Sequence, residues 1–222
     1  MIRKIVDNIV YTDAEKKAIV GIGKMNKDSW DNPTLKDVRD KIKKQLDVVQ
    51  KNIVFPEKYD FIECAYCGLI MGGTGRKEVE HIAHKAKHPE FSYHSMNLVF
   101  ACSHCNGSSK KGQKEVVAKK STLIIDHKTA SYFSDIEAKY TQTKFKILHP
   151  KRNNPDTDYV WGDNEKVILL YGVNLEAKKS IEMFDLKDFH MTQERQKQYE
   201  TEQNYVKNPV NFEKIWKATN NA

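Results

Sequence analysis

Apolar residues recur at helical spacing in the segment that follows Asn32, and they would share one face of a helix. Asn32 is a suitable N-cap, and Pro33 fits the first turn. A shorter helix is expected earlier, where Thr12 and Glu15 have the spacing of a capping box. Together these signals predict a helical arm over residues 1–56. Its apolar stripe favours packing into a core, although a partner helix could use the same surface; the stripe consists of Leu35, Val38, Ile42, Leu46 and Val49.

The middle of the chain changes to the pattern of strands. Residues 77–82 alternate between polar and apolar side chains, which predicts a strand, and residues 97–101 form a second short apolar run that is its expected partner. From Ser103 onward the residues fit a helix, or a turn that leads into one. The predicted order over residues 57–121 is therefore strand, long loop, strand, helix.

The last hundred residues mix both patterns. Residues 143–148 and 167–171 are predicted strands on either side of a turn-rich segment, His149 to Asp156. From Leu175 the pattern becomes helical, with breaks expected near Asp185 and Pro209. We therefore expect residues 122–222 to form an accessory region, a strand pair followed by helices. The fold class of the whole chain is predicted to be α+β.

The chain has four cysteines, and they form two CxxC pairs: Cys64, Cys67, Cys102 and Cys105. Disulfides are typical of short secreted chains, whereas this N-terminus offers no apolar signal segment. A redox CxxC would be expected within a βαβ pattern, which neither pair has. Two CxxC turns can bring four thiolates to one ion. The spacing therefore predicts a structural Zn²⁺ that joins the two ends of the central region.

Composition and charge narrow the functional classes. Apolar residues make up 39% of the 222, and no apolar run approaches the ~20 residues of a membrane span, so we expect a folded cytoplasmic protein with no membrane partner. The net charge is +7, yet residues 175–222 hold equal numbers of acids and bases. Nucleic-acid contact explains the excess near the central motif better than an ordinary lysine-rich surface does. The basic residues there are Arg76, Lys77, Lys85, Lys87, Lys110, Lys111, Lys114, Lys119 and Lys120.

One set of residues in the cysteine-bracketed segment carries a specific resemblance. An acidic residue, Glu80, precedes His81; Asn97 opens the second strand; Asn106 follows the last cysteine, and Lys110 comes soon after. In order and spacing, this segment resembles the HNH endonuclease family in its zinc-bound form. The resemblance covers about a fifth of the chain and implies a ββα-metal core that hydrolyses nucleic acid.

The chemistry of phosphodiester hydrolysis explains these residue types. A general base must activate water, and a hard cation must relieve charge on the phosphate. His81 is the candidate base, while Glu80 and Asn106 offer oxygens to Mg²⁺ or Mn²⁺. The resemblance further implies that Asn97 fixes the loop and orients His81. It also implies that Lys110 and Lys111 bind the phosphate. The predicted catalytic residues are therefore His81, Asn97 and Asn106.

Two residues depart from the family pattern. Glu80 stands where aspartate is commoner, and its extra methylene changes the reach of the carboxylate to a metal ion. His84 stands where proline is frequent, which leaves an auxiliary contact with substrate open. Each assignment also has a plainer alternative, since a surface acid is often only solvated and Asn106 could simply cap a helix.

The longer layout, including His149 to Asp156, resembles HNH proteins of retron and Septu-type anti-phage defence systems. That resemblance implies an effector nuclease acting on double-stranded DNA more than on RNA, with an ABC-type ATPase as partner. The competing class is a zinc-knuckle module that binds nucleic acid or another subunit without cutting. Neither zinc binding nor charge requires Glu80, His81, Asn97 and Asn106 together, so their joint presence favours the nuclease.

Overall fold

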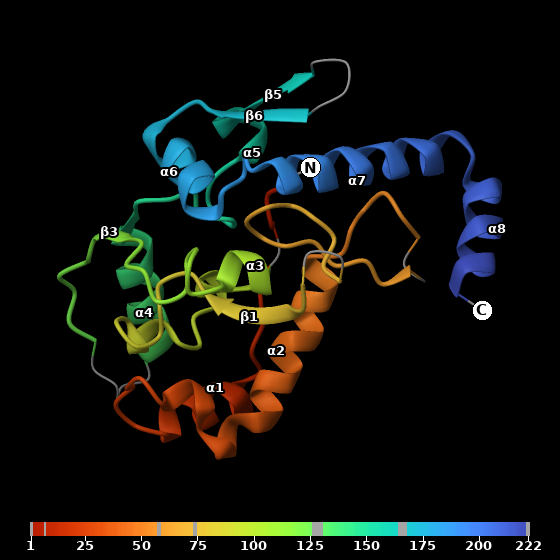
Figure 1. Ribbon diagram of the computed structural model, residues 1–222. Coiled ribbons are helices and arrows are strands. Elements are labelled where there is room, and N and C mark those ends of the chain that lie inside the picture. The colour runs from red at the N-terminus through yellow and green to blue at the C-terminus, as the bar shows by residue number, and fades with distance from the viewer. Residues whose placement is uncertain are drawn as a thin grey trace.

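Two antiparallel strands near the middle of the chain lie among helices that come from both of its ends, as Figure 1 shows. The computed structural model describes residues 2–6, 8–56, 59–72, 75–125, 131–163 and 168–220. The expected α+β class is confirmed, with helices at the N-terminus, a central cysteine-bracketed region and a mixed C-terminal region.

The N-terminal helices begin at the predicted caps. Thr12 and Glu15 form a complete capping box at the start of α1 (Asp13–Gly21). Asn32 caps a short 3₁₀ turn, Pro33–Leu35, which leads directly into α2 (Lys36–Val49). The apolar stripe of α2 packs into the core, because the side chains of Val38, Ile42 and Leu46 are all buried. Another 3₁₀ turn, Ser29–Asp31, lies between α1 and the turn at Pro33–Leu35 and buries Trp30.

The central strands and helix follow the expected order. Strand β1 (Lys77–His81) pairs antiparallel with β2 (Leu98–Cys102), with Glu80 opposite Val99 and His81 opposite Leu98. The helix or turn expected from Ser103 onward is helix α3 (Ser103–Asn106), a single turn. Gly112 has φ +41°, and a Cβ there would lie 2.9 Å from the Cα of Ser108. The chain therefore turns back after α3 and enters β3 (Val117–Lys119).

In the C-terminal region, the two predicted strands pair with different neighbours. The first shortens to β4 (Lys144–Phe145) and joins β3, while the second, β6 (Ile168–Gly172), joins the unpredicted β5 (Tyr159–Asp163). Residue 167 of the predicted strand lies outside the described residues. Helices α4 (Tyr132–Gln142) and α5 (Pro155–Asp158) were also not predicted.

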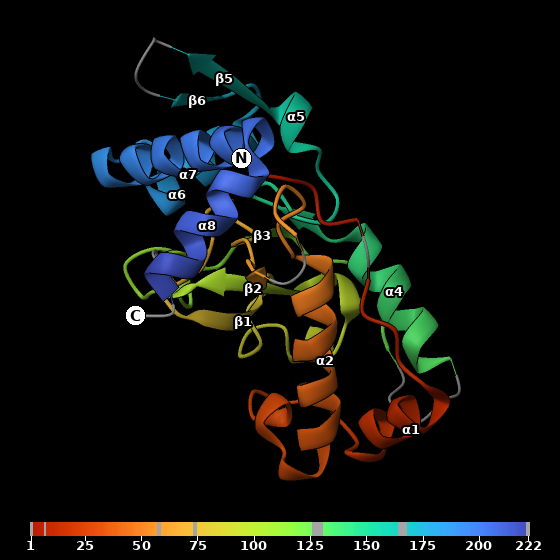
Figure 2. The same cartoon turned by 90° about the vertical axis from the view of Figure 1, so that its right-hand side faces the viewer.

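The final helices have the predicted breaks. Helix α6 (Leu175–Phe184) ends at Asp185, which has φ 48° in the left-handed region, and α7 (Phe189–Lys207) is separated from α8 (Pro209–Asn220) by Asn208. Figure 2 shows α7 lying across the molecule above β1 and β2. In the described part of the chain, no helix combines the length and the apolar character that crossing a membrane requires.

Helices α6 and α7 dock on the turn that carries the first cysteine pair. The ring of Tyr66 stacks on that of Phe184, with centroids 4.3 Å apart and planes at 16°. The side chain of Gln198 in α7 donates to the carbonyl of Gly68 and accepts from the amide of Ile70, at 3.1 and 2.8 Å. The C-terminal region therefore supports the cysteine turn directly.

Candidate active site

Four buried sulfur atoms meet at the base of the central region. The sulfur atoms of Cys64, Cys67, Cys102 and Cys105 all lie within 4.8 Å of one another. Gly68, at φ 71°, closes the first turn, and its amide donates to the Cys64 carbonyl at 2.9 Å. The amide of Cys102, at the end of β2, donates to the Cys64 sulfur at 3.3 Å. Four thiolates at this spacing fit one tetrahedral Zn²⁺, as predicted.

A cavity of about 630 Å³ lies where β1 ends and α3 ends. Three of the predicted site residues, Glu80, His81 and Asn106, line it together. Asn97, Lys110 and Lys111 are not among its lining residues. The full lining consists of Val79, Glu80, His81, His84, Lys85, Asn106, Ser108, Gly112, Gln113 and Lys114.

His81 is held by its ring nitrogen and by an aromatic neighbour. Its Nε2 lies 3.1 Å from the carbonyl oxygen of Ser92. Because a carbonyl only accepts, Nε2 carries the proton, and the neutral ring keeps its lone pair on Nδ1. The ring of Trp30 meets the imidazole edge to face at 4.6 Å. Burial, helped by the charge of Lys85, lowers the pKa of His81 to about 3, so the ring is neutral at physiological pH.

The carboxylate of Glu80 is buried beside a cation. Glu80 is 4% exposed, and its Oε1 forms an ion pair with the ammonium group of Lys111. The hydroxyl of Tyr66 also donates to Oε1, at a long 3.5 Å. Burial raises the pKa of Glu80, while the Lys111 ammonium acts in the opposite direction. The ion pair therefore favours the charged form that could bind a metal ion.

The two predicted phosphate ligands differ in position. Lys111 is fully buried, and its Nζ donates to the carbonyl of His81 at 2.9 Å in addition to pairing with Glu80. A buried ammonium with these partners is not placed to bind a phosphate, so the role predicted for Lys111 does not fit its environment. Lys110 lies nearer the surface and pairs with Asp185 at the end of α6.

Asn97 fixes the loop that follows β1. Its Oδ1 accepts from the amide of Ala83 at 2.6 Å, and its Nδ2 donates to the carbonyls of Ala83 and Phe91 at 3.1 and 3.0 Å. The hydroxyl of Tyr140 donates to the same Oδ1 at 3.1 Å and lies 2.8 Å from Nε2 of His149. The turn-rich segment after residue 148 therefore buttresses the loop that carries the Ser92 carbonyl.

Asn106 binds a second acidic residue of β1 that the sequence analysis missed. Its Nδ2 donates to Oε2 of Glu78 at 2.8 Å, and the guanidinium group of Arg76 binds the other oxygen at 2.6 Å. The alternation of a strand places Glu78 on the same face as Glu80, which was a usable signal. With the amide nitrogen engaged, the Asn106 side-chain oxygen is the atom suited to a hard cation. Together with the carboxylate of Glu80, it forms a donor set that fits Mg²⁺ or Mn²⁺.

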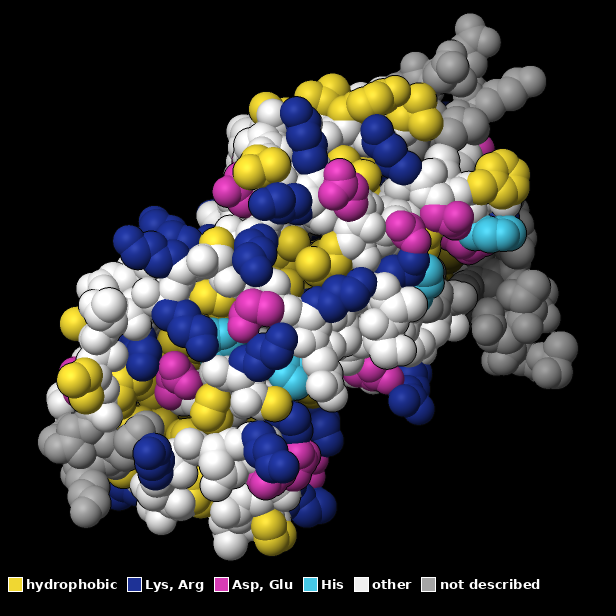
Figure 3. All heavy atoms as spheres, turned by 60° about the vertical axis from the view of Figure 1, so that its left-hand side comes forward, with side chains coloured by type: hydrophobic (Ala, Val, Ile, Leu, Met, Phe, Trp, Pro, Cys, Tyr) yellow, Lys and Arg dark blue, Asp and Glu magenta, His cyan; other side chains and the backbone are white. Residues whose placement is uncertain are grey.

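Basic side chains spread over the face that Figure 3 shows, with histidine side chains among them. Several residues of the predicted basic cluster are already paired, such as Lys77 with Asp47 and Lys85 with Asp31. Lys87 is exposed near the loop after β1. The basic surface is therefore partly neutralised by the protein's own carboxylates.

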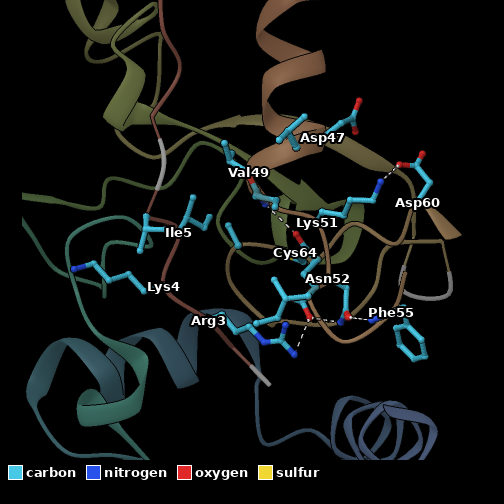
Figure 4. A pocket seen from close by; sticks show the side chains of 16 residues that line it. Arg3, Lys4, Ile5, Asp47, Val49, Lys51, Asn52, Phe55, Asp60 and Cys64 are labelled. Carbon is cyan, nitrogen blue, oxygen red and sulfur yellow. Dashed lines mark hydrogen bonds and ion pairs between the residues drawn. The ribbon is translucent and has the colours of Figure 1, made fainter. Parts of the chain in front are cut away.

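A second cavity, of about 670 Å³, lies between the N-terminal segment, the end of α2 and the first cysteine turn (Figure 4). At its wall, Nδ2 of Asn52 donates to the carboxylates of Glu63 and Glu202 at 2.6 and 2.9 Å. Arg3 lies 3.8 and 3.7 Å from the same two carboxylates. The cluster joins the N-terminal segment, the cysteine turn and α7.

The strand–loop–strand–helix unit, closed by a four-cysteine site and carrying a Glu–His pair at the end of its first strand, defines a ββα-metal nuclease core. Residues 64–114 match the family model described as HNH endonuclease, so the chain contains an HNH endonuclease domain. Members of this family are phosphodiester hydrolases that act on nucleic acid. No curated protein and no solved structure matches the chain.

Proposed function

We propose that this protein is a divalent-metal-dependent endonuclease that cleaves double-stranded DNA in preference to RNA. One observation carries the proposal: a histidine with a free Nδ1 lone pair, a carboxylate and an amide oxygen all line one cavity. His81 is the general base, and Glu80 and Asn106 bind the ion. Bound there, Mg²⁺ or Mn²⁺ would offset negative charge on the phosphate and on the departing oxygen.

His81 takes the proton of the attacking water on Nδ1 as the new bond between oxygen and phosphorus forms. The bond from phosphorus to the 3′ oxygen then breaks. Burial keeps the imidazole in its neutral form, which is the form that can act as a base. The Ser92 carbonyl fixes the ring by accepting from Nε2, and Asn97 fixes the loop from which that carbonyl projects. Asn97 is thus a positioning residue, and Lys110 supplies a point charge for the phosphate once Asp185 releases it.

Plasmid nicking by the zinc-loaded protein with Mg²⁺ or Mn²⁺ tests the assignment. His81→Ala should lower cleavage by at least ~100-fold and leave zinc content and DNA affinity unchanged, because the ring holds neither zinc nor the phosphate. His190→Ala is the matched control, since His190 is an exposed histidine of α7. Undiminished cutting by His81→Ala would rule out His81 as the base, and a duplex RNA substrate run in parallel tests the preference for DNA.

We also propose that the nuclease is the effector of an anti-phage defence system and that an ABC-type ATPase controls it. The support is the resemblance carried by His149 to Asp156 and the balanced charge of residues 175–222, which suits protein contacts better than phosphate contacts. The outer face of the β5–β6 hairpin and the neighbouring helix ends also expose apolar side chains, namely Val160, Tyr171, Val173, Leu175 and Phe189.

Co-purification from the native cell tests the partner. Because α6 and α7 support the cysteine turn, removing them would disturb the zinc site. Tyr171→Lys on the exposed hairpin face is the better variant. It should abolish capture of the ATPase and leave zinc content and basal cleavage as they are. A full-length protein that cuts DNA rapidly and captures no ATPase would contradict control by such a partner.

A further inference from the structure

The ammonium group of Lys111 is buried against the proposed ion site, whereas that of its neighbour Lys110 lies near the surface. The Lys111 ammonium contacts Oε1 of Glu80 and the carbonyl oxygen of His81. The Tyr66 hydroxyl also donates to Oε1. The backbone amide of His81 donates to the same carboxylate. Together these donors hold the carboxylate in one orientation, beside the cavity that Glu80 lines with Asn106.

The backbone around Lys111 keeps the ammonium where it is. The Lys111 amide donates to the carbonyl of Cys105 at 3.3 Å, so the residue is tied to the second cysteine turn. The next residue, Gly112, adopts a left-handed conformation that closes the turn tightly against Ser108. If the side chain swung out to a phosphate, Glu80 would be left buried and unpaired, which is strongly unfavourable. The four-cysteine site therefore fixes the position of this charge.

We propose that Lys111 is a positioning residue of the divalent-ion site: it holds Oε1 of Glu80 and thereby orients the carboxylate toward the ion in the cavity that Asn106 also lines. The inference rests on the proposed function of Glu80 and Asn106 as ion ligands. Fixed partners of metal ligands orient those ligands and typically account for about 10- to 100-fold in metal affinity. Lys111 would act through Glu80, without touching the substrate.

The test is Mn²⁺ binding by the full-length, zinc-loaded protein, followed by electron paramagnetic resonance, with Glu80→Gln defining the background from other sites. Lys111→Met keeps the length of the side chain and removes its charge. We expect it to weaken Mn²⁺ binding about 10- to 100-fold, with zinc content and DNA affinity unchanged. Lys110→Met is the matched control: it should keep Mn²⁺ affinity and weaken DNA binding.

Two outcomes would overturn the inference. Unchanged Mn²⁺ affinity with weaker DNA binding would return Lys111 to the phosphate. Tighter Mn²⁺ binding by Lys111→Met would show that the ammonium competes with the ion instead of orienting its ligand. Weaker Mn²⁺ binding by Lys111→Met, together with normal Mn²⁺ binding by Lys110→Met, supports the positioning role.

If Lys111→Met does not fold, the double variant Glu80→Gln/Lys111→Met decides the matter. Removing both charges of a buried pair costs far less than removing one. Recovery of zinc content and thermal stability in the double variant would show that the ammonium serves Glu80, as proposed. A double variant that stays unfolded would mean that Lys111 serves the His81 carbonyl and the packing, which contradicts the proposal.

Failure of the proposed function gives a different result. If wild-type protein shows no Mn²⁺ signal that depends on Glu80, the ligand assignment itself is wrong. If Glu80→Gln abolishes that signal and Lys111→Met preserves it, only the role of Lys111 falls.

Discussion

Two buried carboxylates in this molecule, Glu80 and Glu63, meet cations from distant parts of the chain but serve different ends. Glu80 is 4% exposed and pairs with Lys111; Glu63 is 7% exposed and lies 3.8 Å from Arg3. Glu80 borders a cavity shared with a histidine and an asparagine. Glu63 lines the other cavity and is linked through Asn52 to a second carboxylate, that of Glu202.

The difference shows that burial of an acid is not by itself a functional signal. Glu63 and Glu202 share the side-chain amide of Asn52 and the guanidinium group of Arg3. This cluster holds together the N-terminal segment, the first cysteine turn and α7. Because Asn52 and Arg3 each contact both carboxylates, we interpret the cluster as a structural clamp. Glu80 is held by Lys111, Tyr66 and the His81 amide, and it lines a cavity together with a histidine and an asparagine.

The largest effect is expected where both regions depend on one element. The first cysteine turn carries Cys64 beside Glu63, and the second holds the backbone of Lys111 through Cys105. Cys105→Ser should lose the zinc ion, whose binding contributes on the order of 10 kcal/mol to structural zinc sites, and should disrupt both carboxylate environments. Metal analysis and thermal unfolding measure this. A normally folded, zinc-free variant would show that the two regions are independent of the metal.

Glu80→Gln and Glu63→Gln separate catalysis from folding. We expect Glu80→Gln to lower Mg²⁺-dependent cleavage by about 100-fold, since an amide oxygen binds the ion more weakly than a carboxylate does. Glu63→Gln should leave the cleavage rate close to that of wild type. Plasmid nicking over a range of Mg²⁺ concentrations checks both variants. Equal losses of cleavage in the two variants would mean that Glu80 and Glu63 do not differ in role.

The extent to which the sequence predicted these regions follows from the range of the interactions. The capping box at Thr12, the cysteine pairs and the two central strands depend on neighbours within a few residues, and all were predicted. The contact of Trp30 with His81 and that of Tyr140 with Asn97 join residues far apart, and no local pattern indicates either. The domain limits at residues 56 and 121 remain a prediction, although β3 and β4 pair across the second limit.

Lys111 illustrates why some of the site could not be predicted. In the sequence, Lys110 and Lys111 are equivalent members of a basic run, and both suit a phosphate. The tight turn at Gly112 and the bond to Cys105 direct one inward and leave the other near the surface. Such a distinction depends on the backbone path after α3, for which the sequence predicted only a helix or a turn that leads into one.

The clamp should also make stability depend on pH. Burial raises the pKa of Glu63 to about 7, from 4.5 for the free side chain. Because the folded protein binds this proton more tightly than the unfolded chain does, the stability of the protein falls as pH rises from the unfolded to the folded pKa of Glu63. The loss is about 3 kcal/mol. The amide side chain in Glu63→Gln cannot ionise. The unfolding free energy of this variant should therefore fall less than that of wild type between about pH 5 and about pH 8. Denaturant unfolding at both pH values measures this, and parallel curves would contradict the shift.

The pH profile of cleavage should be flatter than a free histidine would give. With the pKa of His81 lowered to about 3, the base is already neutral throughout the acid-to-neutral range. At saturating Mg²⁺, cleavage should therefore show no inflection near ~6.5, where an unperturbed imidazole titrates. Initial rates measured at constant metal occupancy check this. A rise centred near that pH would point to a more exposed base, and His84→Ala would be the next variant to examine.

The smallest expected effect comes from the contact between the C-terminal region and the nuclease core. Asp185 pairs with Lys110, and it also ends α6 in a left-handed conformation that asparagine tolerates. Asp185→Asn therefore removes the charge and keeps the turn. Freeing one partly buried lysine near the surface should raise DNA affinity only about two- to fivefold, because ion pairs near the surface contribute little, and should steepen the salt dependence of binding. Glu182→Gln, which removes the same charge from an exposed position of α6, is the control. If both variants raise affinity equally, the gain reflects net charge alone, whereas a gain specific to Asp185→Asn means that the C-terminal region holds Lys110 away from the phosphate.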